Sequence, residues 1–458
     1  MKRIQSLDVL RGIAMLFMVA MHAFMKVGWH NIGDVLNNMS AYPWYVLVPL
    51  GIFSFIATWR GLFLLISAIV SIYGFQSAIQ QGKSPHITLI KYFSWAVILF
   101  IQGLAIQVLW NPYTGFYRMA LGVVDFQEFL GHLRWSDAVE TIAITIAISS
   151  IIQYFLCLGK KRDKYWISIS VYLALMVVVL VSNKFIVNSI LNATEFTDLR
   201  QIKYGTIENF GDRIRLLGLA LLIGEQQPLF PFLATAFLGN AFGIALTRPN
   251  LEKKWFIRIG FLVGLSIIIA AVFVGLFVEH FEIVTTIVPN LWFFLASLGA
   301  QTWVFILFLH LLDFSKNASK RLKSTKIFQK AGILSLTIFS LQSIDFIPRF
   351  LLYGGSLALS DLYGIGTPID FLNNGGSYGM GAALLVSFVV LFFWIGIISL
   401  WEKINFALSF DWIFSIIRNL LAGRKINWKD PLHSRDIFLN SESVFHEAIS
   451  SISSIGPS

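Results

Sequence analysis

The sequence is short of cysteine and of charged residues. Its single cysteine, Cys157, excludes an intramolecular disulfide and any metal site built from several cysteines. Charged residues make up 13% of the 458 positions, whereas hydrophobic residues make up 56%. A water-soluble domain carries roughly twice that share of charge. The composition therefore excludes an ordinary soluble domain and indicates a helical protein with many membrane spans.

Several common catalytic and nucleotide-binding motifs are also missing. The chain has no P-loop, no Rossmann glycine fingerprint and no HEXXH motif. This argues against a soluble-type nucleotide fold and against a zinc hydrolase, and we predict no metal site. The net charge of +10 could suggest nucleic acid, but the basic residues lie between apolar runs. They therefore indicate membrane topology, and we expect no nucleic-acid partner.

Ten apolar runs are each long enough to cross a bilayer, which takes about 20 mostly apolar residues. We therefore predict an all-α, polytopic bundle of about ten transmembrane helices. The predicted spans are residues 8–25, 60–80, 92–110, 136–158, 165–183, 228–247, 257–278, 289–313, 331–353 and 379–401.

The charges between the spans predict the orientation. With a cytoplasmic N-terminus, the inner segments hold 25 of the 35 Lys and Arg residues. This asymmetry follows the positive-inside rule. An eleventh span would move every basic loop after it to the outer side, so the charges favour an even number of spans. We therefore expect a multi-pass protein of the plasma membrane with both termini in the cytoplasm.

Three further segments complete the predicted organisation. The span-bearing bundle covers residues 1–404. Within it, Pro43–Ala57 is apolar but contains prolines, which favours a re-entrant or interfacial piece on the outer side. Residues 405–427 form an amphipathic helix that would lie on membrane lipid. Residues 428–458 turn polar and serine-rich, as is typical of a flexible cytoplasmic tail.

The first thirty residues carry the most informative polar groups. Asp8 and Arg11 are three apart at the front of the first span, so they share a helix face and can pair. One interpretation is a paired helix start, with Asp8 favoured by the helix dipole. The other is a binding site, because charged groups at this depth are costly unless they have a function or a partner. His22 and His30 follow on the same stretch, and imidazole can exchange a proton near neutral pH.

The stretch SLDVLRGIAMLFMVAMH resembles the opening of the transmembrane acyltransferases related to heparan-α-glucosaminide N-acetyltransferase. Integral-membrane polysaccharide O-acetylases begin in a similar way. A second stretch, AGILSLTIFSLQS from Ala331, resembles another helix of this family, although Ile333 replaces its basic residue. The matching positions are Arg3, Ser6, Leu7, Asp8, Arg11 and Gly12 in the first stretch, and Gly332, Ser335, Leu336 and Thr337 in the second.

The resemblance implies transfer of an acetyl group from cytoplasmic acetyl-CoA to an extracytoplasmic sugar or glycan. Acetyl-CoA, or another acyl-CoA, would be bound by Asp8, Arg11, Ser335 and Lys330, the last in place of the missing basic residue. His30 matches the position of an essential histidine in the family. It would act as general base or carry the acyl group, and His22 is the second candidate.

Asp137 and Glu140 open the fourth predicted span and share a helix face. Asp137 is a third catalytic candidate, because it could orient an imidazole or contact a sugar hydroxyl. An equally good explanation is that both acids stabilise the helix N-terminus.

Two other classes of function stay open. A transporter or flippase for a small molecule or lipid-linked glycan would fit the span number, although ionisable residues are scarce in the middle of the spans. The third hypothesis is a structural or scaffold membrane protein without catalytic activity. The sequence does not define the oligomeric state, and a homodimer is left open.

Overall fold

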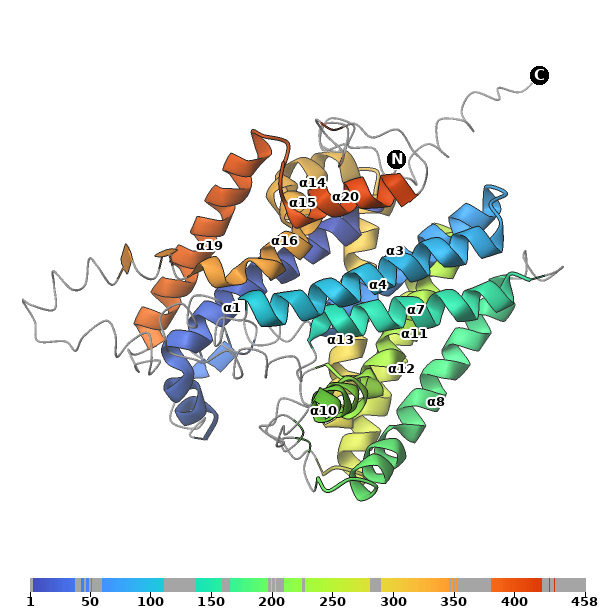
Figure 1. The fold of residues 1–458 in the computed structure, drawn as a ribbon, viewed down its shortest axis with the longest axis horizontal. Helices are drawn as coiled ribbons and strands as arrows, with labels where there is room; N and C mark the ends of the chain where they lie inside the picture. The colour runs from blue at the N-terminus through green and yellow to red at the C-terminus, as the bar shows by residue number, and fades with distance from the viewer. Residues whose placement is uncertain are drawn as a thin grey trace, which may run out of the picture. The chain divides into compact units, whose positions relative to one another are not determined.

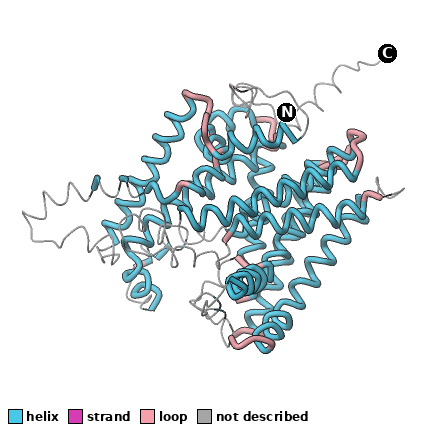
Figure 2. The backbone as a smooth tube through the Cα atoms, in the orientation of Figure 1, coloured by secondary structure: helices cyan, strands magenta, loops and turns pink. Residues whose placement is uncertain are grey.

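The computed structural model describes residues 3–37, 60–110, 137–158, 165–196, 210–224, 227–280, 290–345 and 380–421, with a few isolated positions outside these ranges. Within these ranges the chain consists of helices and short loops, without strands (Figure 2). The prediction of an all-α polytopic membrane protein is confirmed. A helix satisfies its backbone hydrogen bonds internally, which the lipid interior requires.

Nine helices in the described part of the chain are long and apolar enough to cross a membrane, and they match nine of the ten predicted spans. The helices that contain these segments are α1 (Gln5–Asn37), α3 (Arg60–Gln80), α4 (Pro85–Trp110), α7 (Ala138–Leu156), α8 (Tyr165–Asn192), α11 (Leu229–Leu246), α12 (Lys253–Phe277), α13 (Leu291–Leu309) and α19 (Met380–Glu402).

The remaining predicted span, residues 331–353, is not one continuous helix. The chain there forms α15 (Lys326–Ile333), α16 (Ser335–Ser340) and the 3-10 turn η5 (Gln342–Asp345). The backbone leaves the helical region at Leu334, with φ −91° and ψ 15°, and again at Leu341, with φ −103° and ψ 12°. Hydropathy is continuous across these two breaks, so the sequence pattern cannot reveal them.

The chain divides into two compact units. Unit 1 comprises residues 1–59 and 307–458, and unit 2 comprises residues 60–306. Unit 1 holds α1, α15, α16 and α19, and also η4 (His310–Phe314), α14 (Ala318–Ser324) and α20 (Phe410–Leu421). Unit 2 holds α3, α4, α7, α8, α11, α12, most of α13, and the shorter α10 (Phe210–Ile223).

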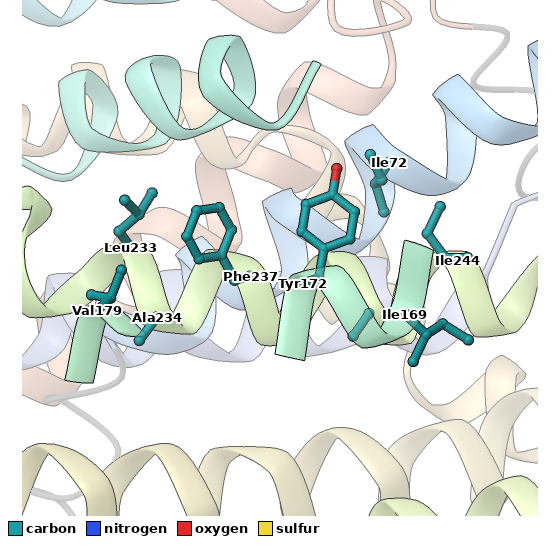
Figure 3. Packing of buried hydrophobic residues seen from close by; sticks show 9 residues of the cluster. Ile72, Ile169, Tyr172, Val179, Leu233, Ala234, Phe237 and Ile244 are labelled. Carbon is teal, nitrogen blue, oxygen red and sulfur yellow. The ribbon is translucent and has the colours of Figure 1, made fainter. Parts of the chain in front are cut away.

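Helix α11 is the centre of unit 2, where it packs against both α3 and α8. Figure 3 shows the apolar side chains between these helices, with the ring of Tyr172 beside that of Phe237. The two ring centroids are 6.0 Å apart. Helices α4 and α7 run side by side in the same unit (Figure 1).

Gly239 and Gly243 allow α11 to approach α3 closely, as the G-x-x-x-G spacing predicts. A Cβ added to Gly239 would lie 2.7 Å from the carbonyl oxygen of Leu65. A Cβ added to Gly243 would lie 2.8 Å from the carbonyl oxygen of Ile69. These distances are too short for any side chain, so the two helices meet backbone to backbone.

In unit 1, α1 packs along α15 and α19, and α16 contacts both α1 and α20 (Figure 1). Helix α20 forms the central part, residues 410–421, of the segment 405–427 predicted as an amphipathic helix, whereas residues 405–408 form turns. Its placement on membrane lipid stays a prediction. The predicted re-entrant piece Pro43–Ala57 and the predicted tail 428–458 lie almost entirely outside the described residues.

Candidate functional site

The N-terminal end of α1 is held by a carboxylate from a distant part of unit 1. Asp313 of η4 is fully buried, and its two oxygens accept the backbone N–H groups of Gln5 and Ser6 at 3.1 and 2.9 Å. Gln329 of α15 donates a further bond to the side chain of Gln5 at 2.7 Å. A carboxylate at the first turn satisfies free N–H groups and complements the helix dipole. The start of α1 is therefore fixed against η4 and α15.

Asp8 forms its ion pair with Arg3, at 3.3 Å, in the described part of the chain. The expected pair of Asp8 with Arg11 is therefore replaced by a pair with Arg3, which precedes the first residue of α1. Arg11 lies within electrostatic range of Asp8 and also of Asp411, the second residue of α20. The front of α1 thus gathers two cations and two carboxylates, three of them from the motif that carries the resemblance.

Asp411 joins α20 to the start of α16. One of its carboxylate oxygens accepts the backbone N–H of Thr337 at 2.9 Å and the hydroxyl of Thr337 at 2.7 Å. Burial raises the pKa of the Asp411 carboxyl from 3.8 to about 6, while the bonds from Thr337 and the charge of Arg11 act in the opposite direction. The carboxyl therefore titrates just below neutral pH.

The raised pKa of Asp411 predicts that α20 docks more firmly in acid. The docked carboxyl binds more protons than the undocked one between pH values near 3.8 and about 6. Stability consequently falls as pH rises through that window and is constant above it. We expect Asp411→Asn, which stays neutral, to remove this dependence, a difference of about 2–3 kcal/mol. Thermal unfolding of both proteins in detergent from pH 4 to pH 7.5 measures it, and parallel curves would contradict the assignment.

The two stretches that carry the resemblance lie face to face. Gly12 of α1 meets Gly332 of α15 so closely that a Cβ on Gly12 would overlap the carbonyl oxygen of Phe328 and lie 2.8 Å from the nitrogen of Gly332. A Cβ on Gly332 would overlap the carbonyl oxygen of Asp8. Backbone contact of this kind requires glycine on both helices. The motif helix and the segment from Ala331 therefore form one packed element.

His22 lies on α1 and contacts η5, which directly follows α16. Its Nδ1 is 2.8 Å from the side-chain oxygen of Gln342. Because an amide oxygen can only accept, Nδ1 is the donor in this bond. His30 also belongs to α1, which extends well beyond the predicted span, but its side chain lies outside the described residues. The two imidazoles are thus carried by one continuous helix.

The residues predicted to bind acyl-CoA all belong to unit 1, but they differ in their surroundings. Lys330 is ion-paired with Glu402 at the end of α19, so a carboxylate already balances its charge. Ser335 is the first residue of α16 and is half-buried, two positions before Thr337. Asp8 and Arg11 lie one helix away, on α1.

Asp137 belongs to unit 2 and serves as the N-cap of α7. Its side chain accepts the N–H of Ala138 at 2.7 Å, and its own N–H donates to Glu140 at 3.1 Å. Asp137 and Glu140 form a capping box, in which each side chain accepts a backbone N–H of the other residue. This arrangement agrees with the interpretation that both acids stabilise the helix N-terminus. The role of Asp137 towards an imidazole or a sugar stays a prediction.

Sequence reasoning missed Asp313, Gln342 and Asp411. Asp313 had one available signal, since a lone acid in the apolar run around Leu309 must find a partner at that depth. Gln342 and Asp411 carry no such signal. In the described ranges, no group of three or more His, Cys, Asp and Glu side chains could hold a metal ion.

No protein-family model matches the chain, and no curated protein matches it either.

Proposed function

We propose that the chain is a membrane-embedded acyltransferase that moves an acetyl group from acetyl-CoA to a sugar or glycan acceptor. The observation that carries the proposal is the contact of Gly12 with Gly332. Two stretches more than 300 residues apart resemble the same enzyme family, and each supplies one glycine of the contact. Unrelated chance matches would not be expected to pack on each other at their matching positions.

The charges at the front of α1 suit the donor. Guanidinium groups bind phosphate oxygens through strong charge-assisted bonds, and Arg3 and Arg11 both lie at this end of the helix. Asp8 holds Arg3 in place through their ion pair. In the proposed orientation this end of α1 faces the cytoplasm, where acetyl-CoA is made available, and the acceptor lies across the plasma membrane.

The chemistry requires a base for the acceptor. An imidazole of α1, His30 or His22, would take the proton of a sugar hydroxyl or amine as its oxygen or nitrogen attacks the thioester carbonyl. The C–S bond then breaks, and the imidazolium returns the proton to the coenzyme A thiolate. In the alternative sequence the imidazole itself attacks first and carries the acetyl group to the acceptor.

Acetyl transfer by the purified protein tests this function. Labelled acetyl-CoA is incubated with a panel of sugar and glycan acceptors, and the acetylated product is measured by mass spectrometry. We expect replacement of the catalytic histidine, as His30→Ala or His22→Ala, to lower the rate by about 10²–10⁴-fold. His86→Ala is the control, because His86 contacts Tyr154 in unit 2 and should leave the rate unchanged.

Two negative results together would overturn the proposal. These are the absence of transfer to every acceptor and the absence of thermal stabilisation by coenzyme A, which any bound ligand should produce. Unchanged rates in both single variants and in the double variant would remove histidine from the mechanism while leaving the transferase activity standing.

A transporter is the second candidate, and one observation favours it. Short helices interrupted within a spanning segment often bind substrate in transporters. The α15–α16–η5 segment has this character, with breaks at Leu334 and Leu341. Uptake of a sugar or glycan into proteoliposomes without any thioester would favour transport, whereas acetylated product formed only with acetyl-CoA would favour transfer.

A further inference from the structure

A row of polar side chains runs the length of α7 in unit 2. Its members are spaced four residues apart, so each is the next neighbour of the last along the helix surface. All are buried, although α7 is one of the helices apolar enough to cross a membrane. With a rise of about 1.5 Å per residue, the row extends roughly 24 Å, most of the thickness of a hydrocarbon core. We call it the α7 polar row; it consists of Thr141, Thr145, Ser149, Gln153 and Cys157.

Neighbouring helices of unit 2 add polar groups to the same row. Gln153 donates to the side-chain oxygen of Gln76 on α3 at 2.9 Å. Asn240 of α11 donates to the hydroxyl oxygen of Ser149 at 2.6 Å. Thr141 donates to the backbone carbonyl of Gln227, just before α11. The row therefore lies where α7 meets both α3 and α11, away from the lipid-facing surface.

Several buried oxygens along the row have no hydrogen-bond donor in the part of the chain that the structure describes. Thr145 donates to a carbonyl of its own helix at 2.9 Å, so its hydrogen is already used. The side-chain oxygens of Gln153, Asn240 and Gln227 have no donor among the described residues. All three residues are at most 2% exposed. Each of these oxygens would destabilise the fold if it stayed unpaired and dry.

Polar bonding between helices explains only part of this arrangement. Ser, Thr, Asn and Gln often join membrane helices to one another, and the bonds to Gln76 and Ser149 are of that kind. That explanation leaves the three carbonyl oxygens unpaired, because lipid tails offer no donor. Buried oxygens of this type are normally satisfied by water molecules that bridge several polar groups.

We propose that the α7 polar row is a hydrated tract, a binding site for a file of water molecules and other small hydrogen-bond donors between α3, α7 and α11. The three residues with unpaired oxygens meet the row at different levels: Gln227 through its backbone contact with Thr141, Asn240 through its bond to Ser149, and Gln153 as a member of the row. Hydroxyl and amide groups between these levels supply the additional partners that each water needs. Cys157 ends the row, with its sulfur 3.4 Å from the amide nitrogen of Gln153.

Thiol accessibility tests the tract, and the chain's single cysteine makes the experiment simple. Ser149→Cys and Thr145→Cys are introduced separately into a Cys157→Ser background. Ala143→Cys is the matched control, because Ala143 lies on α7 two positions from Thr145, is 1% exposed, and is not part of the row. The full-length variants, in detergent and in vesicles, are treated with a small hydrophilic methanethiosulfonate reagent, and modification is followed by intact mass.

We expect the cysteines at positions 149 and 145 to react at least about tenfold faster than the cysteine at position 143, because a thiol reacts only where water and reagent reach it. If either variant fails to elute as folded protein, the other variant and Cys157 of the natural chain give the same readout. Equal, slow reaction at positions 149, 145 and 157 and at the control position would show a dry row and overturn the proposal.

Discussion

Replacing Gly12 with alanine should prevent unit 1 from folding, or destabilise it by more than about 3 kcal/mol, since overpacked backbone contacts cannot relax cheaply. The new methyl group would overlap the carbonyl oxygen of Phe328 and crowd the nitrogen of Gly332. Both are backbone atoms of α15, so no rotamer change can make room. The loss would appear as a lower yield of monodisperse protein and a lower thermal unfolding temperature in detergent.

Gly396→Ala is the matched control for this prediction. Gly396 lies inside α19, also in unit 1, and a Cβ built there meets no atom within 4 Å. Alanine is favoured over glycine in a helix interior by about 0.5–1 kcal/mol, so this variant should be neutral or slightly more stable. If the Gly12 and Gly396 variants unfolded at the same temperature, the close crossing of α1 and α15 would be wrong.

Long apolar segments could be predicted because their signal is local. The run from Leu384 to Glu402, for example, has enough length and hydropathy to indicate a span without any knowledge of its neighbours. The same rule fails for residues 331–353. There the breaks at Leu334 and Leu341 accompany contacts with α1 and α20, through Gly332 and Thr337. Hydropathy records how apolar a segment is and carries no information on such distant contacts.

The candidate site shows the same division between local and distant information. The capping box of Asp137 and Glu140 follows from their spacing, and both of its bonds are present. The ion-pair partner of Lys330 cannot be predicted from spacing, because Glu402 lies 72 residues away along the chain. The ion pair of Asp8 could not be predicted from helix spacing either, because its partner Arg3 lies before the first residue of α1. A single sequence predicts which side chains need partners better than it predicts which partners they find.

Asp313 gives the second large expected effect, because it supports the helix that carries the resemblance and both histidine candidates. In Asp313→Ala the backbone N–H groups of Gln5 and Ser6 would lose their acceptors in a buried environment. Two unpaired buried donors and a lost helix cap should together cost about 3–5 kcal/mol. We expect the purified variant to unfold at a markedly lower temperature, with faster hydrogen exchange in the first turns of α1.

Asp313→Asn separates the cap from simple loss of volume. An amide of nearly the same size keeps one oxygen for one of the two N–H groups and presents an NH₂ group to the other, so we expect a cost of about half that of alanine. Asn also removes the charge that complements the dipole at the start of α1, an effect of about 0.3–1 kcal/mol near a surface. An asparagine variant as stable as the natural protein would show that the charge contributes nothing. An alanine variant as stable would show that α1 does not depend on this carboxylate, and the position of its motif would then need another explanation.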